Sequence, residues 1–169
     1  MADQTSLRTA DDPWRTGRSA RSLDEVDRRI LGELTEDGRL SIRALADRVH
    51  VSRANAYARV NRLLADGVIT GFAAEVDPER AGLGTSAYVL LTIQQNTWRE
   101  VAAALADLPY LEHFALVGGD FDVLALIRAP DNAALRHLVL ERIHEIEGVR
   151  GTRTWLIFDE QDGHGVDWT

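Results

Sequence analysis

The chain has 169 residues, a formal net charge of −8 and no cysteine. Without cysteine it can form no disulfide framework, thiolate metal site or cysteine nucleophile. Its hydrophobic content of 45% suits a globular protein, and no apolar run approaches the roughly 20 residues that a membrane-spanning helix needs. The amino-terminal residues also lack the apolar core of a secretory signal, so we expect a cytoplasmic protein with no membrane contact.

The negative charge is concentrated in the second half of the chain. Residues 23–77 contain eight arginines and ten acids, a net charge of −2, whereas residues 78–169 contain seven arginines and fourteen acids, a net charge of −7. The overall charge therefore does not exclude a nucleic-acid partner for the first half.

Three helices are predicted after a polar, mobile tail at residues 1–22. From Val26, apolar residues at helical spacing predict a first helix that ends near Gly38. Ser41 and Ser52 are good N-caps for a short second helix and a longer third one. Two capped helices that meet across a tight turn are typical of helix-turn-helix proteins, which place the later helix in the DNA major groove.

The third predicted helix has an apolar side and an outward polar side. Ala56, Val60, Leu63 and Leu64 form the apolar side. The outward side combines small alanines, which permit close approach, with amide and guanidinium groups that suit base edges and phosphates. We expect Arg62 to contact a phosphate. The residues predicted to contact DNA are Ser41, Ser52, Arg53, Ala54, Asn55, Ala58, Arg59 and Arg62.

Two alternatives to DNA contact stay open at this helix. A polar outer face is also what any solvated helix shows, and only the helix-turn-helix context favours DNA. Arg59 lies at the margin of the buried side, so an ion pair with an acid of the first helix is as compatible with its position as a phosphate contact. The candidate acids are Asp24, Asp27 and Glu33.

The rest of the chain predicts an α+β protein with a winged helix-turn-helix and a second, ferredoxin-like domain. VITGFAAEV is expected to form two short strands around Gly71, a wing, and Thr97 with Glu100 to form a capping box. The later strands and helices follow the order βαββαβ. The predicted segments are a tail at 1–22, the winged helix-turn-helix at 23–76, a linker at 77–84, the ferredoxin-like effector and oligomerisation domain at 85–160 and a tail at 161–169.

The second domain is expected to pair with a copy of itself. In a ferredoxin-like unit both helices cover one face of the sheet, yet the strands carry apolar residues on both sides. Burying the second face against a second copy is the simplest cover, so we expect a homodimer. The residues expected on this second face include Leu90, Phe114, Leu116, Leu124 and Leu126.

A small-molecule site is suggested by the turn between the two middle strands. The N–H groups of Gly118 and Gly119 suit a carboxylate, and Asp120 or Asp122 suits an ammonium group, although the same residues fit ordinary turn chemistry. Thr152 and Thr154 share one face of the last strand and are expected to line the same cleft.

Metal-ligand spacing occurs once, on the last helix. The residues His137, Glu141 and His144 lie on one helix face, but that face is opposite the apolar one. We interpret it as a solvated stripe and expect no metal and no cofactor.

Five segments, in this order, resemble the Lrp/AsnC family of regulators. They are LDEVDRRILGEL, LADRVHVSRANAYARVNRLLADGVITGF, VDPERAGLG, VGGDFDVLALI and GVRGTRTWLIF. The resemblance implies a DNA-binding transcription regulator that is not an enzyme, assembles as dimers and often octamers, and responds to an amino acid or related metabolite. Gly119, Asp120 and Asp122 match the family's Gly-acid-aromatic-Asp pattern, which favours the effector interpretation of the turn.

One residue departs from the family pattern, and two other functions remain as alternatives. His50 stands where the family usually has glycine; histidine tolerates a left-handed backbone better than most residues, so we expect the turn to persist. One alternative is an enzyme similar to the sirohaem decarboxylases, which resemble this family. The other is a ligand-binding assembly protein whose helix-turn-helix is vestigial.

Overall fold

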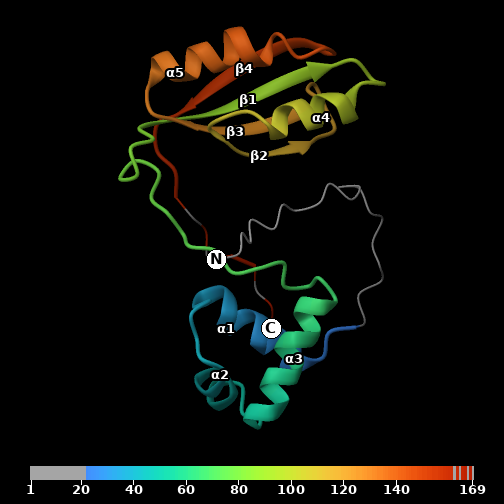
Figure 1. Cartoon of the computed structure of the whole chain (residues 1–169), viewed down its shortest axis with the longest axis vertical. Helices are drawn as coiled ribbons and strands as arrows, with labels where there is room; N and C mark the ends of the chain where they lie inside the picture. Colours follow the sequence, from blue (N-terminus) through green and yellow to red (C-terminus); the bar gives the residue numbers. More distant parts are fainter. Residues whose placement is uncertain (1–21, 162, 164, 167, 169) are drawn as a thin grey trace, which may run out of the picture. The chain divides into compact units, whose positions relative to one another are not determined.

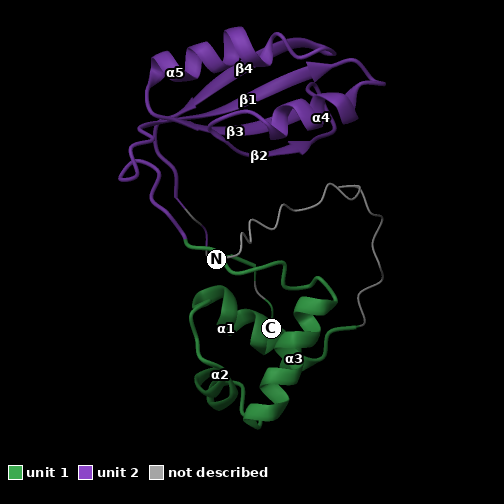
Figure 2. Ribbon diagram, viewed as in Figure 1, with its two compact units in different colours: residues 1–74, 164–169 green, residues 75–163 purple. Residues whose placement is uncertain are grey.

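A computed structural model describes residues 22–161, 163, 165, 166 and 168 of the chain (Figure 1). The chain divides into two compact units, one of residues 1–74 with 164–169 and one of residues 75–163 (Figure 2). The predicted tail at 1–22 lies outside the described residues except for Ser22, as do parts of the predicted tail at 161–169. Among the described residues, none of the helices is long and apolar enough to cross a membrane.

The first unit contains the three predicted helices and both predicted caps. The Ser41 hydroxyl accepts a hydrogen bond from the Ala44 N–H at 3.1 Å, and the Ser52 hydroxyl accepts one from the Asn55 N–H at 3.2 Å. Each cap satisfies one of the N–H groups that a helix start leaves without a partner. The helices are α1 (Glu25–Glu36), α2 (Ile42–Arg48) and α3 (Arg53–Ala65).

A small apolar core holds these helices together. Its buried members come from the three helices and from Val49, directly after α2. Trp168 packs against them. The prediction for Leu64 is wrong: its side chain is 38% exposed, because it lies about 100° around α3 from the buried Leu63. The buried cluster consists of Ile30, Leu31, Leu45, Val49, Val60 and Leu63.

The turn between α2 and α3 has the left-handed residue that the sequence predicts. His50 adopts a φ of 58°, and the Val51 N–H donates to the Ala46 carbonyl at 3.0 Å to close the turn. The predicted wing strands are wrong, since residues 66–84 contain no strand. Val68 and Ile69 pack instead against the helical core, and an isolated two-stranded hairpin is only marginally stable in water.

An ion-pair network joins α3 to the start of α1. Asp24 and Asp27 form a reciprocal capping box, in which the Asp27 N–H donates to Asp24 Oδ1 at 2.9 Å and the Asp24 N–H donates to Asp27 Oδ2 at 3.2 Å. Arg59 Nη1 lies 2.7 Å from Asp24 Oδ2 and 2.7 Å from Asp27 Oδ1. Arg62 Nη2 lies 2.6 Å from the same Asp27 oxygen. The ion-pair alternative for Arg59 is therefore confirmed, and Arg62 shares it.

Asp27 is the central group of this network. Its side chain is only 2% exposed, and a buried carboxylate is tolerated only when it is paired and hydrogen-bonded. The hydrogen bond from Arg59 holds the pKa of the exposed Asp24 below its ordinary value of 3.8. Asp24 and Asp27 in turn raise the pKa of Arg59. Both shifts favour the charged forms of Asp24 and Arg59, so this pair stays charged across the physiological pH range.

The second unit is a four-stranded antiparallel sheet with helices, in the predicted order βαββαβ. Its strands lie in the order β2-β3-β1-β4, and Figure 1 shows α4 and α5 running along them. The ferredoxin-like prediction is confirmed. The elements are β1 (Thr85–Ile93), α4 (Trp98–Ala106), β2 (Leu111–Leu116), β3 (Val123–Ala129), α5 (Asn132–His137), the π-helical segment η1 (Leu138–Ile143) and β4 (Val149–Ile157).

Alternate residues of the strands pack against the helices. In β1 these are Ala87, Val89, Leu91 and Ile93, which join the buried residues of α4, α5 and η1 in one core. Successive side chains of a strand point to opposite faces, so the residues between them belong to a second face that the helices do not cover. We call it the open sheet face.

Two residues predicted on the open sheet face lie on the other side. Phe114 pairs with Ala125 and Leu116 with Val123, and both pack against the core under the helices. A register shift between Leu111 and His113 inserts an extra residue in β2, which reverses the expected alternation.

The predicted capping box of α4 is also wrong. Thr97 is the N-cap of α4, but its hydroxyl donates to the Gln94 carbonyl at 3.0 Å and makes no cap bond to the helix. Its backbone, with φ −110° and ψ 10°, lacks the extended conformation that capping requires.

The network at Asp24 predicts a specific pH dependence for the first unit. Because the pKa of Asp24 is lowered on folding, its contribution to stability is present above about pH 3.8 and is lost as pH falls through the folded-state pKa. Asp24→Asn keeps an N-cap side chain but removes the charge. We expect this variant to be less stable than the parent at pH 7 and its stability to change less between pH 6 and pH 3.

Urea unfolding of both proteins at a series of pH values measures the effect. Asp47→Asn removes an exposed carboxylate of α2 and is the matched control, which should follow the parent. Parallel stability curves for Asp24→Asn and the parent would contradict the proposed charge effect.

Candidate functional site

The outward side of α3 is exposed within its unit. Ala54, Asn55, Ala58 and Asn61 are all exposed, whereas Ala56, Val60 and Leu63 on the opposite side are buried. The exposed side begins at the capped end of the helix. A duplex could therefore approach this side without displacing any part of the core.

Asn55 is the residue on this side with the most defined geometry. Its backbone N–H is held by the Ser52 hydroxyl, and its side-chain Oδ1 accepts a hydrogen bond from Arg59 Nε at 2.7 Å. The rest of the amide is exposed. A fixed amide at the start of a helix is a group that can read a base edge in a groove.

The candidate arginines fall into two groups. Arg59 and Arg62 are engaged with Asp27, and their side chains are 20% and 38% exposed. Arg53 is exposed and forms no ion pair with any residue in the described part of the chain. Its guanidinium is therefore available for a phosphate without breaking an internal bond.

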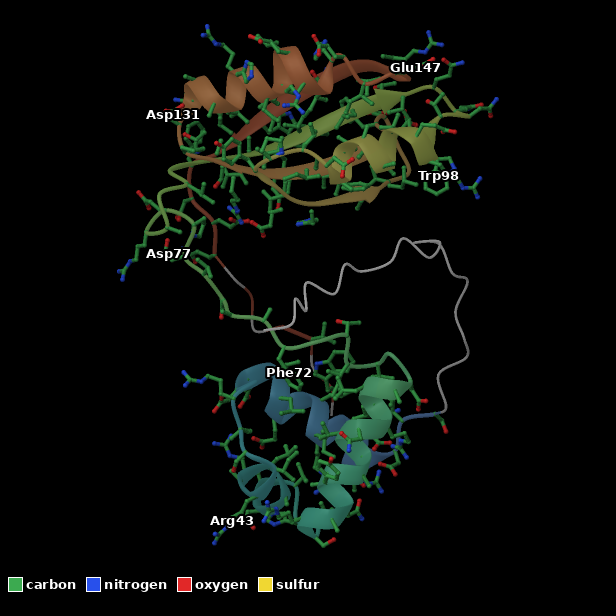
Figure 3. All side chains as sticks on the ribbon, in the orientation of Figure 1. Arg43, Phe72, Asp77, Trp98, Asp131 and Glu147 are labelled. Atoms are coloured by element: carbon green, nitrogen blue, oxygen red, sulfur yellow. The ribbon has the colours of Figure 1, made fainter. Side chains whose placement is uncertain are left out.

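Two further exposed side chains, on α2 and α3, were not predicted as site residues. Arg43, in the first turn of α2 directly after the Ser41 cap, projects away from the unit (Figure 3). Tyr57, on α3 between Ala56 and Ala58, is 58% exposed. The position of Arg43 beside a predicted cap and the outward spacing of Tyr57 were the signals that could have identified them.

The two acidic residues predicted as ligands in the turn between β2 and β3 have different surroundings. Gly118, Gly119 and Asp120 are exposed, and Gly119 has a φ of 139°, which favours glycine. Asp122 is already bonded: its Oδ2 accepts the Ile93 N–H at 2.8 Å, and its own N–H donates to the Leu91 carbonyl at 2.9 Å. Asp120 is therefore the carboxylate open to an outside group.

The two threonines share a face, as predicted, but it is the helix-covered one. Thr152 pairs with Leu91 and Thr154 with Val89, both of which face the helices. The Thr152 hydroxyl lies 2.7 Å from His144 Nε2. Asp122 lies in the turn before β3 and bonds the β3 side of β1, whereas the threonines lie on β4, which pairs with the other side of β1.

A groove of about 360 Å³ lies between α4 and the end of η1, away from the predicted effector residues. The groove is lined by Glu100, Ala104, Leu108, Arg142, Glu145, Ile146 and Glu147.

In the candidate metal stripe, His137 Nδ1 lies 2.9 Å from Glu141 Oε2, and both side chains are exposed. In the described part of the chain no three His, Asp or Glu side chains are grouped as a metal site would require.

Comparisons with known proteins match both units. A model of winged helix-turn-helix DNA-binding domains matches residues 23–70, and a model of the Lrp/AsnC ligand-binding domain matches residues 86–164. The fold also matches a transcriptional regulator from Neisseria meningitidis solved as a complex with L-Met. That match has a TM-score of 0.79 and 27% identity, and it covers 84% of this chain and 94% of the other.

Curated relatives extend the match over most of the sequence. The transcriptional regulator AldR of Mycolicibacterium smegmatis is 36% identical, over 85% of this chain and 86% of its own. The leucine-responsive regulatory protein of Salmonella typhimurium is 35% identical, over 85% of this chain and 89% of its own. With a DNA-binding unit, a ligand-binding unit and relatives of this kind, the chain belongs to the Lrp/AsnC family of transcriptional regulators.

Proposed function

We propose that the protein regulates transcription by reading DNA with the outward side of α3 and by responding to an amino acid or a related metabolite. The observation that carries this proposal is the exposed, capped start of α3, where the Asn55 amide is held by Arg59 and the Arg53 guanidinium forms no ion pair with a described residue. A transcription regulator of this kind acts on chromosomal DNA, so we propose that the protein works in the cytoplasm.

We propose different tasks for the predicted DNA-binding residues. Ala54 and Ala58 are small and exposed, so the helix can approach bases closely. Arg53, with Arg43 on α2, is placed to contact phosphates, and the capped helix starts at Ser41 and Ser52 present N–H groups to the same backbone. Arg62 contacts a phosphate through its exposed edge while it stays bonded to Asp27.

This division predicts different results for two arginine variants. Arg53→Ala should weaken binding to all duplexes and reduce the slope of log affinity against log salt by about 0.9, with an unchanged melting temperature. Arg62→Ala should also weaken binding to all duplexes, but it should lower the melting temperature because Asp27 loses a partner.

Salt-dependent binding assays and thermal unfolding separate these outcomes. Arg150→Ala removes an exposed arginine of β4 and is the matched control, with no expected change in the slope. If Arg53→Ala binds DNA with the parent's affinity and salt slope, α3 does not lie on the duplex as proposed.

We also propose that the open sheet face pairs two chains. Leu90 and Leu124 lie opposite each other on this face, and Tyr88 lies beside Trp155, which is 51% exposed. Leu90 is already buried within one chain, so the apolar area that a second copy would remove from water is mainly that of Tyr88, Leu124 and Trp155. A homodimer places two α3 helices on two half-sites, and dimers then assemble into higher oligomers such as octamers.

Trp155→Asp tests this interface. A charge introduced into an apolar interface remains unpaired when the chains meet, so we expect the dimer to dissociate into monomers at micromolar concentrations. Leu140→Asp is the matched control, because Leu140 is 59% exposed on η1, outside the open sheet face. Sedimentation velocity measures both variants. A Trp155→Asp protein that sediments with the parent assembly would rule out pairing through this face.

The effector proposal rests on the turn between β2 and β3. Exposed N–H groups at Gly118 and Gly119 suit a carboxylate, and the unengaged Asp120 suits an ammonium group. A free amino acid carries both groups, and the related Neisseria meningitidis regulator was solved with L-Met. Asp122 supports this site by holding the turn against β1, and the predicted ligands Thr152 and Thr154 lie on β4, beyond β1.

A thermal-shift screen of amino acids tests the effector. A ligand that binds only the folded chain stabilises it by about 2.7 kcal/mol at 100 times its Kd, which corresponds to a rise of several degrees in melting temperature. Asp120→Asn should abolish the rise, whereas Asp159→Asn, at an exposed carboxylate after β4, should retain it. An undiminished rise for Asp120→Asn would place the ligand elsewhere.

The two alternative functions have less support. The relatives are named transcriptional regulators, which does not favour a sirohaem-decarboxylase-like enzyme. A vestigial helix-turn-helix is at odds with the exposed, capped α3 and with the match of residues 23–70 to DNA-binding domains.

A further inference from the structure

We propose that Arg59 is a positioning residue that sets the orientation of the Asn55 amide and so determines which base edges Asn55 accepts. The inference deepens the proposed DNA recognition and rests on Asn55 as a base reader. It assigns Arg59 a role in specificity without any contact to DNA.

Arg59 is held on two sides. At one side its Nη1 donates to Asp24 and Asp27, and at the other its Nε donates to Asn55 Oδ1 at 2.7 Å. Asp27 is 2% exposed, so this anchor lies in the interior of the unit. The planar guanidinium therefore transmits a fixed position from α1 to an exposed side chain of α3.

The chemistry of arginine determines which end of the amide faces it. A guanidinium has five N–H donors and no acceptor, so it can bond only the oxygen of an asparagine side chain. The amide NH₂ of Asn55 must then point away from Arg59. Because Asn55 is exposed on the outward side of α3, this places a hydrogen-bond donor where a duplex would lie.

An outward donor selects among bases. In the major groove the purines offer N7, guanine also offers O6, and thymine offers O4, all of which accept hydrogen bonds. Cytosine offers only its N4 amino group, which donates. With its oxygen turned towards Arg59, Asn55 should therefore favour guanine, adenine or thymine over cytosine at the base that it contacts.

Lysine cannot replace arginine in this arrangement. Its single ammonium can pair with Asp24 and Asp27 but has no second, rigidly spaced donor for Asn55. Arg59→Lys should therefore keep the charge of the network and release the amide, which separates positioning from ion pairing.

The test uses the full chain. A pool of randomised duplexes is selected with the parent protein, and affinities are then measured for all four bases at each position of the selected site. Asn55→Ala should reduce the preference at one position by about five-fold or more. Arg59→Lys should reduce the preference at that same position and leave the others unchanged, and it should have no further effect in the Asn55→Ala background.

Arg48→Lys is the matched control. It makes the same exchange at another ion pair of this unit, between Arg48 and Glu33, which does not touch Asn55. It should leave every base preference as in the parent. Melting temperatures of all variants show whether a change in preference accompanies a loss of folding.

Each other outcome overturns part of the account. If Asn55→Ala changes no base preference, or if the parent selects no sequence, Asn55 is not a base reader and the proposed recognition fails. If Asn55→Ala relaxes one position but Arg59→Lys retains it, only the positioning role fails. Weaker binding of Arg59→Lys with equal losses at all positions would mean that Arg59 is purely structural.

Discussion

The buried carboxylate of Asp27 is the constraint on which the placement of α3 depends. Two arginines of α3 reach across to it, and the α1 cap residue Asp24 completes the network. Removing one partner of a buried ion pair typically costs about 3–5 kcal/mol, a large part of the stability of a small domain. The same bonds fix the orientation of α3 relative to α1, so the side of α3 that stays exposed is set by α1.

The exposed surfaces of the two units suit different kinds of partner. The first unit has an outward polar helix side, whose natural partner is a charged and polar duplex. The second has a sheet with one face covered by helices and an open sheet face, which we propose pairs with a second copy. Residues 78–169 carry most of the negative charge, which does not favour DNA binding by the second unit. Pairing through the sheet would bring two copies of α3 to one operator, so assembly and recognition depend on each other.

Local signals made much of this structure predictable. Ser41 and Ser52 cap their helices as their residue types suggest, and His50 adopts the left-handed turn. The order of strands and helices in the second unit followed from alternating and helical apolar spacing. These features depend on neighbours within a few residues, which a single sequence reveals.

Features that depend on distant contacts could not be predicted. The register shift in β2 moves Phe114 and Leu116 under the helices, and it exists only in the pairing with β3. The segment after α3 packs against the core instead of forming wing strands. Arg62 was expected to face DNA, and its bond to Asp27 spans 35 positions of the chain. The acid at position 27 was a candidate partner for Arg59, but nothing local showed that one carboxylate would hold both arginines.

A crystal structure of the chain bound to its selected duplex tests the central claim most directly. We expect Arg59 to remain hydrogen-bonded to Asp24 and Asp27, with the Asn55 oxygen on Arg59 and the Asn55 NH₂ on a base acceptor. An Arg59 that has left both aspartates for a phosphate, or a duplex that lies away from the outward side of α3, would contradict the account.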